Sequence, residues 1–203
     1  MSERRRELLR IAADLFAEHG FAKVTVDDIG RAAGVSGPAL YHHFSGKEAL
    51  LGEMLVGISE YLLEGGRRVV AEHDDTADPG PDAGAEALTR LIAFHAEFAV
   101  DDRSLITVHF RDLLHAPPDD QARVRALQSE YVGLWADELQ RRFPELPRAR
   151  ALAAVHATFG LINSTPHSAR LPRAAMLELL TAMASSALIA TFRSETTAVS
   201  VRS

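Results

Sequence analysis

T-V-D-D-I-G-R-A-A-G-V-S-G-P-A-L-Y-H-H-F-S-G-K-E, residues 25–48, holds the start and stop signals of several short helices. Thr25 followed three residues later by Asp28 is typical of a helix N-terminus, because the carboxylate can reach back to the cap and its charge suits that end of a helix. Gly34 stands where a helix most often ends in a residue with positive φ. The first part of the stretch therefore predicts a helix that begins after Thr25 and ends at Gly34.

The rest of the stretch predicts two further helices. Ser36 can cap a helix whose first turn holds Gly37 and Pro38, because the N–H groups of a first turn have no intrahelical partner. The sequence S-G-K-E at residues 45–48 has the spacing of a capping box and precedes a long apolar-periodic run. Two helices joined by a turn of a few residues are typical of a DNA-binding helix-turn-helix.

The short helix expected over residues 39–44 exposes aromatic and imidazole side chains. Leu40 and Phe44 are four residues apart and can pack inward on one face. The side chains left to point outward are Tyr41, His42 and His43, beside Lys47. In a major groove such groups can donate to phosphates or reach base edges. The alternative is a small three-helix subdomain with a solvated polar face.

Residues 4–55 resemble the N-terminal domain of TetR-family transcriptional regulators. An amphipathic segment ending in F-A-E-H-G-F is followed, in order, by T-V-D-D-I-G-R-A-A-G-V-S, A-L-Y-H-H-F and S-G-K-E-A-L-L. The resemblance implies a homodimeric, all-α regulator whose C-terminal domain binds a small molecule and thereby releases double-stranded operator DNA. It also implies phosphate contacts from Thr25, Tyr41, His43 and Lys47, and base-edge contacts from Ser36, Gly37, Pro38 and His42. Because many relatives have a longer side chain where this chain has Gly37, base recognition would depend on Tyr41 and His42.

The distribution of charge is compatible with a DNA-binding N-terminus. The net charge of the 203 residues is −6, but residues 1–50 contain as many Lys and Arg as Asp and Glu. Repulsion between DNA and the acidic remainder is screened beyond about 10 Å at 0.1 M salt. Arg4 to Arg6 form a basic arm that either meets phosphate or is a solvated helix end. The chain has no cysteine, no apolar signal core and no membrane-length apolar run, so we expect a cytoplasmic protein without membrane contact.

The remainder of the chain predicts further helices and no strands. With the first helix, the long ones cover about residues 3–19, 45–73, 83–100, 104–115, 119–143, 148–163 and 172–192. Adding the two short helices gives an all-α fold of about nine helices. We expect a three-helix helix-turn-helix domain over residues 1–48, and a helical effector-binding and dimerisation domain over residues 49–203.

The last two predicted helices are apolar on more than one side. A helix that is apolar nearly all round must be buried, and packing against both its own domain and a twofold-related copy would bury both sides. We therefore expect a four-helix homodimer interface, the alternative being an ordinary monomeric core. The expected interface residues are Leu152, Val155, Phe159, Met176, Leu180 and Met183.

Histidines and aromatic residues of the second domain can line an apolar effector pocket or simply form a core. The run G-L-I-N-S-T-P-H, residues 160–167, places polar groups at the end of a buried helix, where they can cap it or reach a ligand. The candidate ligand-binding residues are His95, Phe98, His109, Phe110, Tyr131, Trp135, Phe159 and Asn163.

Motifs of catalysis and metal binding are missing from the sequence. It has no phosphate-binding glycine loop, no nucleophile elbow and no pair of histidines at the i, i+4 spacing of a helical metal site. We expect no enzyme, no cofactor and no metal. The predicted function is a ligand-responsive transcriptional regulator, most simply a homodimeric repressor that a small-molecule effector releases from its operator. The alternative is a helical ligand-sensing or scaffolding dimer that does not bind DNA.

Overall fold

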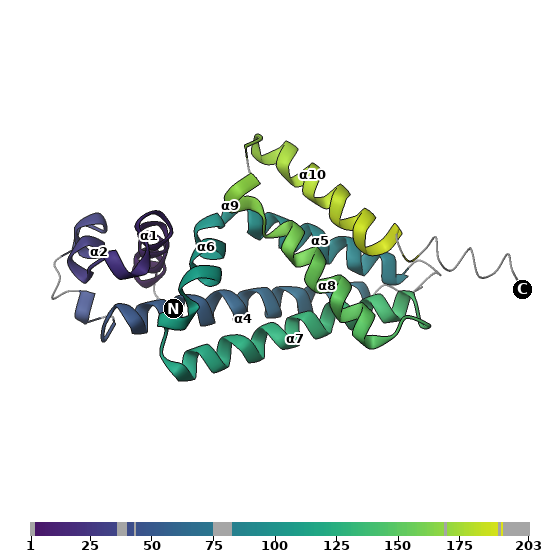
Figure 1. The fold of residues 1–203 in the computed structure, drawn as a ribbon, viewed down its shortest axis with the longest axis horizontal. Coiled ribbons are helices and arrows are strands. Elements are labelled where there is room, and N and C mark those ends of the chain that lie inside the picture. Colours follow the sequence, from purple (N-terminus) through teal and green to yellow (C-terminus); the bar gives the residue numbers. More distant parts are fainter. Residues whose placement is uncertain are drawn as a thin grey trace, which may run out of the picture. The chain divides into compact units, whose positions relative to one another are not determined.

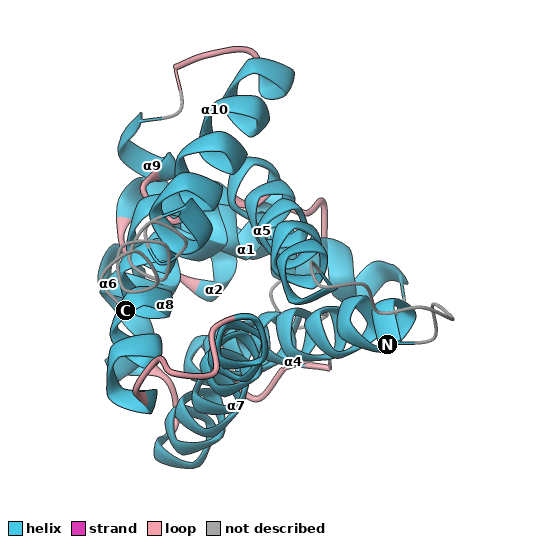
Figure 2. Ribbon diagram, turned by 90° about the vertical axis from the view of Figure 1, so that its right-hand side faces the viewer, coloured by secondary structure: helices cyan, strands magenta, loops and turns pink. Residues whose placement is uncertain are grey.

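The computed structural model describes residues 3–35, 40–42, 44–74, 83–168, 170–190 and 192, and within them every regular element is a helix. Figures 1 and 2 show these helices and the loops that join them. The elements are α1 (Glu3–His19), η1 (Phe21–Lys23), α2 (Val26–Ala32), α4 (Lys47–Asp74), α5 (Ala83–Asp101), α6 (Arg103–Asp112), η2 (Leu113–His115), α7 (Pro118–Arg142), α8 (Arg148–Ile162), α9 (Thr165–Ser168), α10 (Arg173–Ser185) and η3 (Ser186–Ala190). The predicted all-α class is confirmed.

Two of the expected local structures can be compared with the described residues only in part or differ in detail. The short helix expected over residues 39–44 falls partly on residues 39 and 43, which lie outside the described residues. The polar run after α8 contains α9, a single helical turn between α8 and α10. Among the described helices, none is long and apolar enough to cross a membrane.

The chain divides into two compact units, each built from two stretches of sequence. Unit 1 contains residues 1–61 and 102–127, and unit 2 contains residues 62–101 and 128–203. This division differs from the expected one, which placed a single domain boundary at residue 48. The first half of α4, all of α6 and the start of α7 belong with the N-terminal helices, because α4 and α7 each run from one unit into the other.

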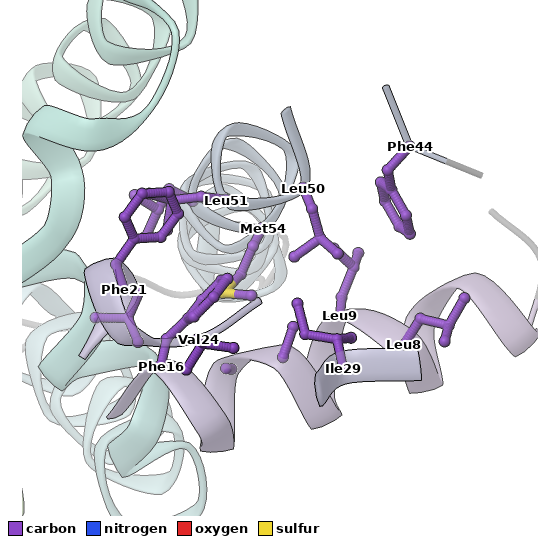
Figure 3. Packing of buried hydrophobic residues seen from close by; sticks show 14 of the residues in the cluster. Leu8, Leu9, Phe16, Phe21, Val24, Ile29, Phe44, Leu50, Leu51 and Met54 are labelled. Carbon is purple, nitrogen blue, oxygen red and sulfur yellow. The ribbon is translucent and has the colours of Figure 1, made fainter. Parts of the chain in front are cut away.

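The core of unit 1 forms where the apolar stripes of α1, α2 and α4 meet (Figure 3). Leu8 and Phe16 of α1 and Ile29 of α2 are completely buried there. The residues of α4 in this core are Leu50, Leu51, Met54 and Leu55, and those from the second stretch of the unit are Val108, Ala116 and Val124. The helix-turn-helix is therefore packed on a core that needs residues from beyond position 101.

Arg111 of α6 fastens the C-terminal end of α1. Its guanidinium donates to the main-chain carbonyls of Phe16 and Ala17, the latter at 3.2 Å, and its Nε donates to the buried carboxylate of Asp112 at 3.1 Å. A cation at the carbonyl end of a helix suits the helix dipole, and it gives a further donor to the Phe16 carbonyl, which also accepts from the Gly20 N–H at 2.8 Å. Because the partners are more than 90 residues apart, sequence patterns give no sign of this contact.

In unit 2, two adjacent glycines let α4 come close to α5 and α7. A Cβ added at Gly65 would lie 2.1 Å from Cζ of Phe94, and one added at Gly66 would lie 2.6 Å from Cε2 of Tyr131. Real Cβ atoms do not approach so closely, so any larger residue would displace an aromatic ring. The two glycines are therefore required by packing, although they lower the helix propensity of α4.

The burial of α8 and α10 within the chain differs among the residues expected at the dimer interface. α10 packs against α5 and α8 of the same chain. Val155, Met176 and Leu180 are buried in this intramolecular core, so the single chain leaves almost none of their surface exposed to a second copy. Of the other expected contacts, Leu152 and Phe159 are half-buried and Met183 is 47% exposed. Periodicity shows that such helices are apolar on several sides, but tertiary packing determines which side faces the core.

Candidate DNA-binding head and effector site

Thr25 and Asp28 form the predicted capping box at the start of α2. The Asp28 N–H donates to Oγ1 of Thr25 at 3.2 Å, and the Thr25 N–H donates to Oδ2 of Asp28 at 3.0 Å. The Thr25 hydroxyl also donates to Oδ2 at 2.6 Å, and this bond, followed by the main-chain bond from Thr25, lowers the pKa of the Asp28 carboxyl. The Thr25 side chain therefore fixes the start of α2, which is a positioning role in addition to the expected phosphate contact.

Gly34 ends α2 as its position predicts. Its φ is +67°, a conformation that favours glycine. The N–H of Val35 donates to the carbonyl of Gly30 at 2.9 Å, and the N–H of Gly34 donates to that of Arg31 at 3.2 Å. This is the Schellman arrangement, which satisfies the last carbonyls of a helix and fixes the direction in which the chain leaves it.

The described part of the expected recognition helix has the predicted inner and outer faces. Leu40 and Phe44 are buried in the core of unit 1. Tyr41 is 57% exposed and His42 is exposed too, so both side chains can reach a ligand outside the chain. Four of the other expected contacts, Ser36, Gly37, Pro38 and His43, lie outside the described residues.

Lys47, an expected phosphate contact, is engaged within the chain. Its Nζ donates to the carbonyl of Phe21 at 3.0 Å and to that of Val24 at 3.1 Å, and lies 4.4 Å from the centroid of the Phe21 ring. An ammonium group has three donors, so one further contact is possible. Lys47 therefore holds the segment between α1 and α2 against the start of α4, whether or not it also meets a phosphate.

Two of the three arginines in the N-terminal basic arm contact other parts of unit 1, whereas Arg6 is exposed. Arg4 donates to the carbonyl of Ala33 at 2.7 Å and so joins α1 to the end of α2. Arg5 forms an ion pair with Glu53 of α4, and its guanidinium lies 4.4 Å from the centroid of the Phe44 ring. These contacts brace the helices on which Tyr41 and His42 depend. Neither contact is evident from the sequence, because the partners of Arg4 and Arg5 lie 29 and 48 residues away.

Six of the eight candidate ligand-binding residues meet in unit 2. They come from α5, α7 and the end of α8, and are His95, Phe98, Tyr131, Trp135, Phe159 and Asn163. The rings of His95 and Phe159 are stacked, with centroids 4.6 Å apart. Trp135 is nearly perpendicular to His95, Tyr131 and Phe159, with ring centroids 4.9 to 6.0 Å away. We call these six residues the aromatic cluster.

His95 is the centre of a hydrogen-bonded chain in this cluster. Nε2 lies 3.1 Å from Oδ1 of Asn163, and Nδ1 lies 3.3 Å from the Tyr131 hydroxyl. Because a carbonyl oxygen only accepts, Nε2 carries the proton and Nδ1 accepts from the tyrosine. Burial lowers the pKa of His95 to about 4, although the Asn163 hydrogen bond acts in the opposite direction. The imidazole is thus neutral at pH 7.

The other two candidates, His109 and Phe110, do not join the aromatic cluster. They lie on α6, which belongs to unit 1, whereas the cluster belongs to unit 2. Phe110 is 68% exposed, and the His109 ring meets it edge-on at a centroid distance of 5.5 Å. Both residues were expected in the second domain, because sequence patterns do not reveal that α6 belongs to unit 1.

Unit 1 thus has a short helix, α2, that is capped at both ends and is followed in sequence by the exposed Tyr41 and His42, and unit 2 has a buried aromatic cluster. Such a combination defines a helix-turn-helix protein with a helical second unit. Profiles of two families match the chain: "Bacterial regulatory proteins, tetR family" over residues 8–54, and "Tetracyclin repressor-like, C-terminal domain" over residues 81–167. The chain belongs to the TetR family of transcriptional regulators, which are not enzymes.

Individual relatives agree with this assignment. The chain is 34% identical to the HTH-type transcriptional repressor KstR2 of Rhodococcus jostii (strain RHA1) over 140 residues, which are 68% of this chain and 65% of that protein. A TetR-family regulator from Bordetella parapertussis 12822 superposes with a TM-score of 0.75 at 26% identity, over 91% of this chain and 95% of the other. For the ketosteroid transcriptional regulator KstR2 of Mycobacterium tuberculosis, the TM-score is 0.72 at 25% identity, over 92% and 95%.

Proposed function

We propose that this protein is a homodimeric repressor that binds a pseudo-palindromic operator and releases it when a small molecule binds in unit 2. The observation that carries the proposal is the exposure of Tyr41 and His42 directly above the buried Leu40 and Phe44. Large polar aromatic groups held outward on a fixed scaffold suit a major groove, where they can contact phosphates and base edges. The repressors among the relatives support the direction of regulation.

The proposed dimer would use the solvent-facing sides of α8 and α10. On α10, Leu179 is 43% exposed and Met183, one turn later, is 47% exposed. On α8, Ala153, Ala157 and Gly160 are exposed at helical spacing, and nothing lies within 4 Å of a Cβ added at Gly160. Small residues on one helix and larger apolar ones on the next can interdigitate across a twofold axis.

The proposed effector site is the aromatic cluster, and its signal would reach unit 1 through the chain segments that the units share. α4 and α7 each contribute residues to both units. An effector that favours a separation of the two recognition helices different from the one that DNA requires would lower the affinity for DNA. DNA must then lower the affinity for the effector by the same factor. In the DNA-bound dimer that separation would be about 34 Å, one turn of the double helix.

DNA binding tests the proposal most directly. Fluorescence polarisation with the DNA upstream of the protein's own coding sequence should show saturable binding that weakens steeply with salt. Tyr41→Ala should weaken binding, whereas Tyr61→Ala, a change at an exposed tyrosine of α4 outside the recognition helix, should not. If the wild-type protein shows no salt-dependent binding near 0.1 M salt, it is instead the alternative, a helical sensing or scaffolding dimer.

A further inference from the structure

Trp135 presents a buried hydrogen-bond donor that its surroundings do not use. Its side chain is completely buried in the aromatic cluster. Among the residues that the structure describes, its Nε1–H has no hydrogen-bond acceptor. A buried donor without a partner is costly and uncommon in native proteins, so it calls for an explanation.

The polar groups around the indole bond to one another, and among the described residues of the cluster the indole N–H is the buried polar group without a partner. The Tyr131 hydroxyl donates to Nδ1 of His95, and Nε2 of His95 donates to Asn163. The one group that the cluster lacks is therefore an acceptor near the indole. A ligand that completes the cluster would supply an oxygen lone pair.

The charge state of the cluster restricts the ligand further. Tyrosine, asparagine and tryptophan are neutral at pH 7, and His95 is buried as the neutral imidazole. One turn further along α7, the buried carboxylate of Glu138 lies 3.2 Å from Arg141, so that pair balances its own charge. An anion enclosed among uncharged rings would lose its hydration without gaining a counter-ion, which is strongly unfavourable.

The cluster reaches the surface at one side. Whereas His95, Tyr131 and Trp135 are buried, Phe159 and Asn163 at the end of α8 are only half-buried. Phe159 is stacked on His95 and meets Trp135 edge-on. A flat molecule that took the place of the Phe159 ring would keep both ring contacts and come within reach of the indole.

We propose that the part of the effector enclosed by unit 2 is an uncharged ring carrying a carbonyl oxygen, which stacks beside His95 and accepts a hydrogen bond from Nε1–H of Trp135. This assignment rests on the proposed effector function of the cluster. In this assignment, the hydrogen bond from Trp135 distinguishes a ring that carries a carbonyl group from a hydrocarbon. A carboxylate is rejected because the cluster has no charge to balance it.

Three probes of nearly equal shape test the assignment: acetophenone, isopropylbenzene and benzoate. Trp135 is the only tryptophan of the chain, so an amide correlation spectrum of the full-length protein contains a single indole N–H signal. Acetophenone should move that signal in a saturable way. Isopropylbenzene should bind about three- to tenfold more weakly, the usual value of one neutral hydrogen bond, and benzoate should not bind in this site.

The variant Trp135→Phe separates the hydrogen bond from the packing. It should weaken acetophenone about three- to tenfold and leave isopropylbenzene unchanged. Because the wild-type probe series needs no variant, the proposal stays testable even if Trp135→Phe folds poorly. It is overturned if benzoate binds as well as acetophenone, if no probe moves the indole signal, or if a folded Trp135→Phe binds acetophenone normally.

The DNA-binding assay shows whether a negative result contradicts only this ligand assignment or also the proposed function. If the protein binds its upstream DNA but acetophenone leaves the indole signal unmoved, the regulator proposal stands and the ligand assignment falls. Acetophenone binding through Trp135 in a protein that does not bind DNA would support the site and remove the repressor.

Discussion

At the scale of single residues, partners inside the chain change what a substitution would report. Lys47 is the clearest case, because its ammonium group bonds to two main-chain carbonyls and lies over the Phe21 ring. Removing this charge would disturb the segment between α1 and α2 as well as any phosphate contact. A loss of DNA binding in such a variant would therefore not by itself establish a phosphate contact.

Lys47→Met should lower the free energy of unfolding by about 1–3 kcal/mol, because hydrogen bonds from a charged donor are lost while the aliphatic stem is kept. Urea denaturation at neutral pH measures this change. Lys23→Met, at an exposed lysine of the same unit, is the control. In the DNA assay, a fall of the salt slope by about one would assign Lys47 a phosphate contact as well. An unchanged denaturation midpoint would mean that the internal contacts contribute little.

His95 makes stability depend on pH in a direction that its pKa fixes. The folded protein holds this imidazole at a pKa of about 4, below the ordinary value of 6.5, so the unfolded chain binds more protons between these two values. The free energy of unfolding therefore rises with pH across that window. The full contribution, on the order of 3 kcal/mol at most, is present above pH 6.5 and is lost as the pH falls toward 4.

His95→Gln should flatten this dependence, since glutamine keeps a donor and an acceptor but does not titrate. Denaturant midpoints of the two proteins at pH 7.5 and pH 5 provide the comparison. His156→Gln, at an exposed histidine of α8, should behave like the wild type. Equal losses of stability in the wild type and in His95→Gln would show that other groups cause the acid sensitivity.

At the scale of elements, two glycines of α4 lie in opposite surroundings, one facing open space and the other in close packing. A Cβ at Gly57 would meet nothing within 4 Å, whereas one at Gly65 would collide with the ring of Phe94. Gly57 therefore lowers the stability of the helix without a packing benefit. Gly65, in contrast, is required for α4 to pack closely on α5. The two positions form a matched pair within one helix.

Gly57→Ala should raise the free energy of unfolding by up to about 1 kcal/mol through helix propensity. Gly65→Ala gains the same propensity but should lower stability by about 1–3 kcal/mol, because overpacking forces the Phe94 ring to move. Thermal denaturation of both variants decides the sign. If Gly65→Ala is stabilised as much as Gly57→Ala, the ring of Phe94 moves aside at no cost and the close approach is not needed.

The elements also show how far the sequence could predict this structure. Cap residues such as Thr25 and Gly34 act on their nearest neighbours, so their pattern predicted α2 correctly at both ends. His95 and Trp135 were expected to line a pocket or form a core, and both are buried in unit 2. Periodicity could not choose between Leu179 and Leu180, because packing against α5 and α8 decides which of two apolar sides is covered.

At the scale of the whole molecule, the exposed side of α10 should control assembly. Met183→Glu places a charge on that side and should dissociate the proposed dimer in sedimentation analysis while leaving the protein folded. Leu180→Glu instead buries a charge in the chain's own core and should unfold it. A folded Met183→Glu that remains dimeric would move the interface away from this side of α10.

The composition of unit 1 has a consequence for synthesis on the ribosome. Val108, Ala116 and Val124 complete the core that carries the helix-turn-helix, and Arg111 supplies the donors at the end of α1. During synthesis, the core around the N-terminal helices would therefore be complete only after residues through about 127 have emerged from the ribosome. A fragment ending at residue 61 would lack these three core residues and Arg111, so we expect that the helix-turn-helix would not fold when it is transferred to another protein as a short N-terminal segment.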